Sequence, residues 1–321
     1  MTSAAAAKSG QQWAVESEGH RAVVAEIGGV LRSYAAGDRE ILDGFGEDVI
    51  SPASAGQILA PWPNRIRDGH YAFEGTTYQL ALTEPARHTA IHGLVNWSRW
   101  HLVERSDDSV TVAYDLPPQV GYPWPLTLRT RWTVGAGGLR CDQEVTNTGD
   151  ANAPWGYSVH PYLQLTGVAV DDILLRVPGK TRVLADARLL PIGAVKVAGT
   201  EYDFTEPRRI GGAVLDTTFG DVDFNADGGS SVTIAAPDGS ARVEVWGDAN
   251  FKWWQVFTGD TLHGERFRRS LAIEPMTCPP DAFRSGRDLI VLAPGQTWSA
   301  SWGVSPSDRP ATTLDRTEDL S

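Results

Sequence analysis

Residues 126–134 read Leu126-Thr127-Leu128-Arg129-Thr130-Arg131-Trp132-Thr133-Val134. The even positions are apolar apart from Thr130, and the odd positions are threonine or arginine. This alternation has a period of two rather than 3.6, so it predicts a β-strand with one buried face. The loop Gly135-Ala136-Gly137-Gly138 follows, and the strand pattern resumes in residues 139–145. Together the two segments predict a β-hairpin with a glycine-rich turn.

Similar paired strands occur on both sides of this hairpin. Glu74-Gly75 separates residues 71–73 from 77–80, and Asp238-Gly239 separates residues 232–234 from 243–246; both dipeptides suit short hairpin turns. No window of twelve or more residues carries the apolar stripe of an amphipathic helix. Because strands follow strands, an antiparallel architecture is favoured over a parallel α/β sheet. We predict an all-β protein, a large antiparallel β-sandwich in a single domain.

Length and local composition set the boundaries of that domain. The chain has 321 residues, a length that large β architectures often reach as one domain. We predict a flexible N-terminus over residues 1–10, one domain over residues 11–305 and a disordered tail over residues 306–321. The tail is polar, contains Pro306 and Pro310, and lacks an apolar run that could be buried.

Charge and cysteine content exclude several classes of partner. The formal net charge is -12, and an acidic surface supplies neither counterion release on nucleic acid nor attraction to anionic lipid. No segment is apolar enough to span a bilayer, and no secretory signal is visible. Cys141 and Cys278 are too few for a disulfide framework and suit a reducing compartment. We predict a soluble cytoplasmic monomer or homodimer without nucleic-acid or membrane partners.

Three residues stand where predicted strands give way to loops. His92 and His160 have side chains that exchange protons near neutral pH, and the proline after His160 holds its backbone extended. Glu274 ends a predicted strand and is followed by a proline-rich segment that stiffens the backbone. The 12 tryptophans also suit a carbohydrate ligand, since aromatic faces stack on the C–H side of sugar rings. Core packing accounts for most of them, so aromatic content alone does not define a function.

A metal site built from His92, His160 and Glu274 is an alternative to acid–base chemistry. The three residues are far apart in the sequence, and no pair has the short spacing that most metal sites use. We therefore predict no metal.

Several segments, taken together, resemble the aldose 1-epimerase (galactose mutarotase) family. They occur in the family's order and cover nearly the whole chain, and one of them, Gly156-Tyr157-Ser158-Val159-His160-Pro161-Tyr162, has the form of a bacterial subgroup. The matching segments are residues 61–69, 92–93, 121–123, 160–163, 215–219 and 274–283.

The resemblance implies a β-supersandwich with a solvent-open cleft that binds a monosaccharide and needs no cofactor. It implies that His160 is the general acid and Glu274 the general base. The remaining implied site residues are His92, Arg65 and Asp216 as polar groups that hold the sugar, Asn64 as a neighbouring binding residue, and Tyr122 and Trp155 as the apolar wall.

The predicted reaction is the opening and reclosure of a sugar hemiacetal. The ring oxygen must gain a proton while the anomeric hydroxyl loses one, so one acid and one base suffice. We predict an isomerase, an aldose 1-epimerase that interconverts the α and β anomers of a hexopyranose of the glucose or galactose type.

Three alternatives remain open. Val159, Leu163 and Leu94 depart from the galactose mutarotase pattern, so the substrate could be a 6-anionic sugar such as sulfoquinovose. Such a sugar requires a fixed cation, for which the candidates are Arg67, Arg87 and Lys252. A non-catalytic carbohydrate-binding protein is the second alternative, because a fold carries no activity by itself. A metal-dependent sugar isomerase is the third.

Overall fold

The predicted central hairpin is present in the structure. The computed structural model describes residues 7–307. Strand β12 (Leu126–Gly135) pairs with β13 (Gly138–Asn147) through a two-residue turn. Along β12, buried residues alternate with partly or fully exposed ones, as the sequence predicts. The hairpins at Glu74-Gly75 and Asp238-Gly239 are present as well.

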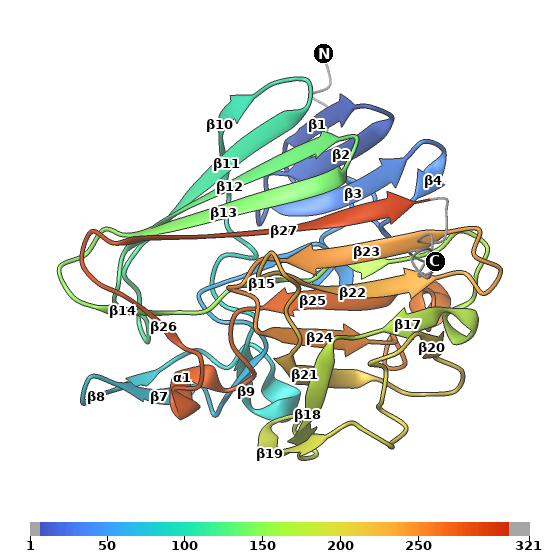
Figure 1. The fold of residues 1–321 in the computed structure, drawn as a ribbon. Helices are drawn as coiled ribbons and strands as arrows, with labels where there is room; N and C mark the ends of the chain where they lie inside the picture. Colours follow the sequence, from blue (N-terminus) through green and yellow to red (C-terminus); the bar gives the residue numbers. More distant parts are fainter. Residues whose placement is uncertain (1–6, 308–321) are drawn as a thin grey trace, which may run out of the picture.

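Two large antiparallel sheets make up most of the fold (Figure 1). The nine-stranded sheet contains, in spatial order, β10 (His101–Arg105), β11 (Ser109–Leu116), β12, β13, β27 (Thr297–Ser307), β23 (Arg242–Gly247), β22 (Ser230–Ala235), β17 (Leu174–Arg176) and β20 (Arg208–Arg209). The eight-stranded sheet contains β19 (Pro191–Lys196), β18 (Gly179–Ala185), β21 (Asp216–Val222), β24 (Trp253–Phe257), β25 (Leu271–Met276), β15 (Ser158–Val159) and β5 (Ile58–Leu59), with β16 (Tyr162–Leu163) also paired to β25.

Smaller sheets and a few helical turns complete the described chain. The four-stranded sheet is β1 (Gln12–Ser17), β2 (His20–Ala25), β3 (Val30–Ala36) and β4 (Arg39–Glu40). The two-stranded sheets are β6 (Arg65–Arg67) with β9 (Thr89–Ile91), β7 (His70–Phe73) with β8 (Thr76–Gln79), and β14 (Ala153–Trp155) with β26 (Ile290–Leu292). Within residues 7–307 the helices are α1 (Ala282–Ser285) and the 3-10 turns η1 (Pro52–Ser54), η2 (Pro85–Arg87), η3 (Val170–Asp172) and η4 (Gly264–Arg266).

The sheets pack face to face around a continuous apolar core. Strands β1 and β2 contact the β11–β13 part of the nine-stranded sheet, and β23 contacts β25 of the eight-stranded sheet. Trp132 of β12 and Trp302 of β27 meet edge to face in this core, with ring centroids 5.7 Å apart. Burial of so many alternating apolar side chains stabilises the sandwich at roughly 25 cal/mol per Å² of apolar surface. The predicted all-β antiparallel sandwich is confirmed.

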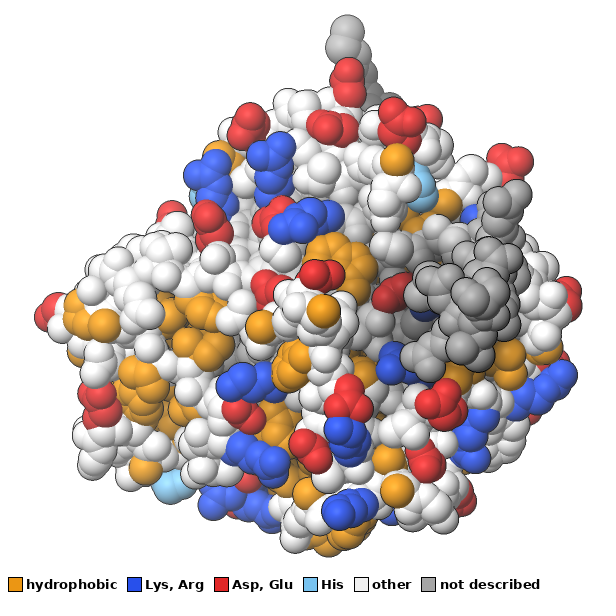
Figure 2. Space-filling view, in the orientation of Figure 1, with side chains coloured by type: hydrophobic (Ala, Val, Ile, Leu, Met, Phe, Trp, Pro, Cys, Tyr) orange, Lys and Arg blue, Asp and Glu red, His pale blue; other side chains and the backbone are white. Residues whose placement is uncertain are grey.

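The surface and helix content bear on the predicted partners. On the face shown in Figure 2, acidic and basic side chains are interspersed, without a continuous basic surface. None of the helices in the described range is long and apolar enough to cross a bilayer.

The described structure continues a few residues beyond residues 11–305 at both ends. Ser9 is buried, its N–H donates to the carbonyl of Glu47, and its own carbonyl accepts from Ile27. Ser9 is therefore in contact with residues of the domain. At the other end β27 continues to Ser307, where Pro306 lies opposite Val243. The partner strand β23 supplies this order, which the polar composition of the segment does not reveal. The rest of both predicted termini, residues 1–6 and 308–321, lies outside the described residues.

Candidate active site

The register of the eight-stranded sheet places two rows of side chains side by side on one face. Ser158 pairs with Met276, and Tyr162 pairs with Ala272. His160 is midway between Ser158 and Tyr162, and Glu274 is midway between Met276 and Ala272. His160 therefore faces Glu274. Glu274 pairs in turn with Gln255, and Gln255 with Thr218. Residues two apart along a strand share a face. The second row is therefore Tyr162, Ala272, Phe257 and Asp216. We call these two rows the cleft floor.

His160 and Glu274 form a close, buried pair at the centre of the cleft floor. Nε2 of His160 lies 3.4 Å from Oε1 of Glu274, and the Glu274 residue is only 2 % exposed. The Tyr162 ring stacks on the His160 imidazole at a centroid distance of 4.9 Å and fixes its plane. Nδ1 of His160 and Oε2 of Glu274 are buried without a hydrogen-bond partner. Buried polar atoms are normally satisfied, so these two atoms suit a polar ligand in the cleft.

Burial shifts the pKa values of this pair in opposite directions. It raises the pKa of Glu274 well above its ordinary value, and the nearby Asp216 carboxylate adds to the rise. It lowers the pKa of His160 to about 4, with a further contribution from the Arg65 guanidinium. Both shifts disfavour charge in a site with little water. Both groups therefore favour their uncharged forms, in which Glu274 holds the proton and His160 is neutral.

Asn64, Arg65 and His92 form the facing wall. Arg65 pairs with Ile91 in the small β6–β9 sheet, and the His92 N–H donates to the Asn64 carbonyl over 3.0 Å just beyond it. Asn64 and His92 both have left-handed backbones, with φ of 54° and 61°. Such conformations are costly for residues other than glycine and are found disproportionately at functional sites. The His92 ring meets the His160 ring edge to face, 5.6 Å apart, and its pKa is lowered by burial and then by His160.

Glu84 holds the Arg65 guanidinium in a fixed orientation. Nε and Nη2 of Arg65 donate to the two carboxylate oxygens of Glu84 over 2.7 Å and 3.0 Å, which is a two-pronged ion pair. Thr89 also donates to Glu84 over 2.7 Å. Burial alone would raise the pKa of Glu84, but these hydrogen bonds outweigh it and the pKa is lowered. Such a planar pair confers geometric precision as well as charge.

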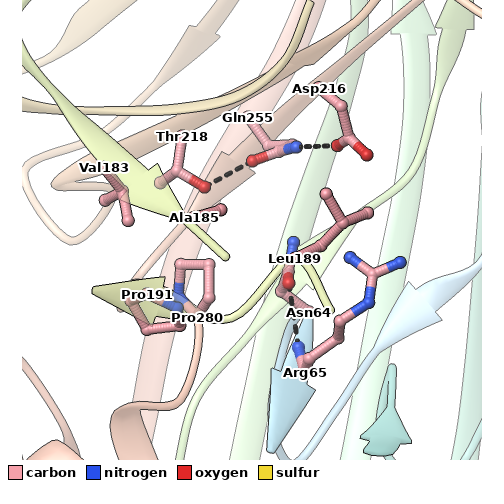
Figure 3. A pocket seen from close by; sticks show the side chains of 10 residues that line it. All are labelled: Asn64, Arg65, Val183, Ala185, Leu189, Pro191, Asp216, Thr218, Gln255 and Pro280. Carbon is pink, nitrogen blue, oxygen red and sulfur yellow. Dashed lines mark hydrogen bonds between the residues drawn. The ribbon is translucent and has the colours of Figure 1, made fainter. Parts of the chain in front are cut away.

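A hydrogen-bond chain orients Asp216 on the opposite side. The Thr218 hydroxyl donates to Oε1 of Gln255, and Nε2 of Gln255 donates to Oδ1 of Asp216 over 2.6 Å (Figure 3). Gln255 is buried, whereas Asp216 is exposed to the cleft. Desolvation by the surrounding protein nonetheless raises the pKa of Asp216. One carboxylate oxygen of Asp216 remains available for a ligand hydroxyl.

These residues line one open cleft of about 320 Å³, within the usual size range of small-molecule sites. Of the eight predicted site residues, the cleft brings together Asn64, Arg65, His92, His160, Asp216 and Glu274. Its apolar surface comes from Ala53, Ile91, Tyr162, Leu189, Phe257 and Leu262.

Tyr122 and Trp155 do not line this cleft, which corrects their predicted role as its apolar wall. Both are 0 % exposed. Tyr122 donates its hydroxyl to the Pro154 carbonyl over 2.7 Å, and Trp155 packs against Tyr157 and Trp298. No tryptophan of the described chain lines the cleft, so the abundance of tryptophan serves mainly the core.

The structure places one of the three candidate cations in the cleft and two outside it. Arg87 lines the cleft, where Nε lies 3.6 Å from Oε1 of Glu84. Arg67 lies outside it and pairs with Asp186 at 3.5 Å. Lys252 lies outside it as well and pairs with Asp288 at 3.0 Å. Only Arg87 of these three can touch a bound sugar.

Sequence reasoning missed Glu84, Gln255 and Leu189. Glu84 and Gln255 are single polar residues without a local motif, and their roles arise from strand pairing and from a contact 19 residues away. Leu189 lies in a turn whose approach to the cleft depends on contacts about 100 residues away in the sequence. Residues 253–257 show no alternation that would mark Gln255, and only the two-residue period of the strand puts it on the same face as Trp253 and Phe257.

Metal-ligating side chains do not cluster in the described residues. Between residues 7 and 307, no group of three or more His, Cys, Asp or Glu side chains is arranged to hold a metal ion. Cys141 and Cys278 are both free and buried.

The fold and cleft define a class of all-β proteins with an open polar cleft on one face of a large sandwich. The family model for aldose 1-epimerase matches residues 11–305, and the chain belongs to this family. It is 32% identical over 289 residues, 90% of this chain and 91% of the relative, to the uncharacterized protein YihR of Escherichia coli. It is 26% identical to the maltose epimerase of Levilactobacillus brevis, covering 75% of this chain and 76% of that protein. A solved aldose epimerase homologue from C. elegans has the same fold, with a TM-score of 0.83 at 17% identity, covering 94% and 99% of the two chains.

Proposed function

We propose that this protein is a mutarotase that interconverts the α and β anomers of a hexopyranose of the glucose or galactose type. The observation that carries the proposal is the cross-strand pair of His160 and Glu274, 3.4 Å apart at the cleft floor. Both oxygens of a hemiacetal are bonded to one carbon, so an acid and a base in contact can reach both of them. Membership of the aldose 1-epimerase family supports the same reaction.

The reaction requires two coupled proton transfers. Burial favours Glu274 as the resting holder of the pair's proton, so this proton first passes to His160 across the 3.4 Å contact. Glu274 then removes the proton from the anomeric hydroxyl while His160 gives its proton to the ring oxygen, and the bond between C1 and the ring oxygen breaks. Rotation about C1–C2 in the open-chain aldehyde presents the other face of the carbonyl. Reclosure reverses both transfers and returns each proton to its starting group. Since the pair begins and ends with one proton, no external acid or base is needed.

The other cleft residues fix the sugar during these steps. Arg65, held by Glu84, and Asp216, held by Gln255, suit hydroxyl groups on opposite sides of the ring. His92, whose Nδ1 is buried without a partner, suits a third hydroxyl. Positioning of this kind contributes to rate by removing the entropy cost of orientation.

Polarimetry on freshly dissolved α-glucose and α-galactose tests the proposal. We expect the purified protein to accelerate the approach to anomeric equilibrium, and Glu274→Gln to lose that acceleration. Binding of either sugar by calorimetry without any acceleration would instead identify a non-catalytic carbohydrate-binding protein.

Arg87 favours a second candidate substrate, a hexose with an anionic group at C6. Its guanidinium lines the cleft, its one close acidic neighbour is 3.6 Å away, and its Nε atom is buried without a hydrogen bond. A sulfonate or phosphate needs such a cation when it leaves water. The test is kcat/KM for glucose against sulfoquinovose in wild type and in Arg87→Gln, with Lys252→Gln as a control cation outside the cleft. A hundredfold preference for the anionic sugar that only Arg87→Gln removes would establish this candidate in place of the neutral hexose.

A further inference from the structure

The turn between β18 and β19 places Leu189 between two hollows. One is the main cleft, and the other is a smaller side hollow lined by Val183, Ala185, Pro191 and Pro280 together with Thr218. Leu189 lines both hollows, as do Asn64, Arg65, Asp216 and Gln255. In Figure 3 the Leu189 side chain lies between Asp216 on one side and Asn64 and Arg65 on the other. Leu189 is thus the apolar partition where the two hollows meet.

The side hollow is small. Its free volume is about 20 Å³, which is enough for about one water molecule. Half of its lining residues are apolar. Of its polar residues, Gln255 bonds to both Thr218 and Asp216, and Arg65 is paired with Glu84. A sugar in the main cleft cannot extend into this space while Leu189 stands between them.

The backbone of the turn fixes Leu189 in an unfavourable conformation. Its φ is 58°, in the left-handed region that favours glycine. Oδ1 of Asp186 accepts from the N–H groups of Arg188 and Leu190 over 2.8 Å and 3.0 Å, and the carbonyl of Asp186 accepts from Leu189 over 2.9 Å. A leucine keeps such a conformation only when its surroundings hold it there.

Arg188 ties this turn to the facing wall of the cleft. Its Nε donates to the carbonyl of Arg87 over 2.8 Å, and its Nη2 donates to Oδ1 of Asp68 and to the carbonyl of His88, each over 2.7 Å. Arg67 adds an ion pair to Asp186 at 3.5 Å. The turn is therefore fixed at both its base and its tip, and Leu189 cannot swing away without breaking these contacts.

We propose that Leu189 is a specificity-determining residue that closes the side hollow and excludes sugars with a substituent on the ring hydroxyl that faces it. Arg188 is the positioning residue that holds Leu189 in place. This inference rests on the proposed function, because it concerns which sugars reach His160 and Glu274.

The test uses the four monomethyl ethers of glucose at O2, O3, O4 and O6, all of which keep a free anomeric hydroxyl. Wild type should discriminate against at least one ether relative to glucose in kcat/KM. Leu189→Gly removes the side chain and suits the left-handed backbone, so it should reduce that discrimination at least tenfold. Leu189→Ala should reduce it less. The ether that is rescued identifies the hydroxyl that faces Leu189.

Leu262→Ala is the matched control, because Leu262 lines the main cleft but not the side hollow. Its discrimination among the four ethers should match that of wild type. The proposal is overturned if Leu189→Gly leaves the ratio for every ether unchanged, or if Leu262→Ala changes the same ratio equally.

Arg188 is tested by its effect on binding rather than on chemistry. Arg188→Ala should raise KM several-fold more than it lowers kcat and should relax the same ether discrimination, whereas Arg188→Lys should restore part of both. An equal fall in kcat for glucose and for the ethers, with KM unchanged, would contradict a positioning role.

The same ratios measured as Kd separate this inference from the proposed function. Calorimetric titration of Glu274→Gln, with and without Leu189→Gly, gives binding discrimination without turnover. If wild type shows no mutarotation but the Kd ratios change as expected, the proposed function fails and the role of Leu189 stands. If neither glucose nor any ether binds, the role of Leu189 is overturned.

Discussion

On the cleft floor, His160 and Glu274 have buried polar atoms without a protein partner, whereas at the rim Arg65, Glu84 and Arg188 are each held by several hydrogen bonds. We use "rim" for the wall formed by β6, β9 and η2 together with the β18–β19 turn. The floor side chains are placed by one sheet register. The rim residues are placed by side-chain contacts between segments far apart in the sequence.

This contrast distinguishes groups suited to proton transfer from groups suited to substrate binding. Groups that lack partners in an open cleft are free to bond to atoms whose charge changes during a reaction. Groups that are already paired keep a fixed position and can bind a hydroxyl with little reorganisation. We therefore expect substitution of the floor pair His160 and Glu274 to change kcat. Substitution of residues that a protein partner already holds, such as Arg65 and Asp216, should change KM, and the following predictions test that division.

The largest expected effect is loss of the proton-transfer pair on the floor. His160→Ala and Glu274→Ala should each lower kcat by about two to four orders of magnitude, which is the usual contribution of a positioned acid or base. Both variants should remain folded by circular dichroism. If either retained more than about a tenth of the wild-type kcat, its assigned role would be wrong.

Substitution of a ligand-holding residue should have a smaller effect of another kind. Asp216→Asn preserves the shape and the acceptor for Gln255 but removes the charge, and Arg65→Ala removes the guanidinium held by Glu84. Loss of a hydrogen bond to a charged group should raise KM roughly tenfold to a hundredfold. We expect kcat to change less than KM, as for lost uniform binding, in steady-state kinetics on the preferred sugar. An unchanged KM would remove these residues from the binding site.

The pH dependence of the free energy of unfolding should show whether His160 has a lowered pKa in the folded protein. Because the pKa of His160 falls to about 4 in the folded protein from 6.5, the folded state binds fewer protons than the unfolded state between these values. The His160 contribution to the free energy of unfolding should therefore rise with pH from about 4 to 6.5, by at most about 1.4 kcal/mol per pH unit.

Urea denaturation of wild type and His160→Gln across this range measures that contribution. The stability difference between the two proteins should shift in favour of wild type as pH rises. A difference independent of pH would show that His160 titrates normally in the fold. Glu274, whose pKa is raised, acts in the opposite sense in both proteins and stabilises the fold less as pH rises above 4.5.

The smallest expected effect concerns a residue outside both the floor and the rim. Tyr122→Phe removes the buried hydrogen bond to the Pro154 carbonyl and should lower the free energy of unfolding by about 1 kcal/mol. KM and kcat should stay at wild-type values, because the ring is fully buried away from the cleft. A several-fold rise in KM would restore the predicted role of Tyr122 as a sugar contact.

The sequence predicted much of the fold because its local patterns carry the relevant physics. The alternation in residues 126–134 directly reflects one buried and one exposed face, and the structure shows it residue by residue. Pairing between distant strands, such as β27 with β13 and β23, leaves no comparable local pattern, because it depends on the whole sheet.

The residues of the candidate site also fall into those that the local sequence indicates and those that depend on distant contacts. His160 and Glu274 stand out in the sequence because prolines beside them mark the ends of strands, and family resemblance adds Arg65 and Asp216. Tyr122 and Trp155 were misassigned because an aromatic residue beside glycine or proline reads equally well as a core residue or a sugar platform. Glu84 and Leu189 were not predicted, since each matters only through a partner that the fold brings close.

The position of β27 has a consequence for how the molecule is made. This strand lies between β13 and β23, so it joins the two halves of the nine-stranded sheet (Figure 1). The ribosome completes β13 and β23 before it begins β27. Until then both strands expose edges with unpaired backbone groups, which are templates for intermolecular pairing. A nascent chain stalled before residue 297 would therefore carry two open sheet edges and be prone to aggregate, until the last strand pairs with both of them.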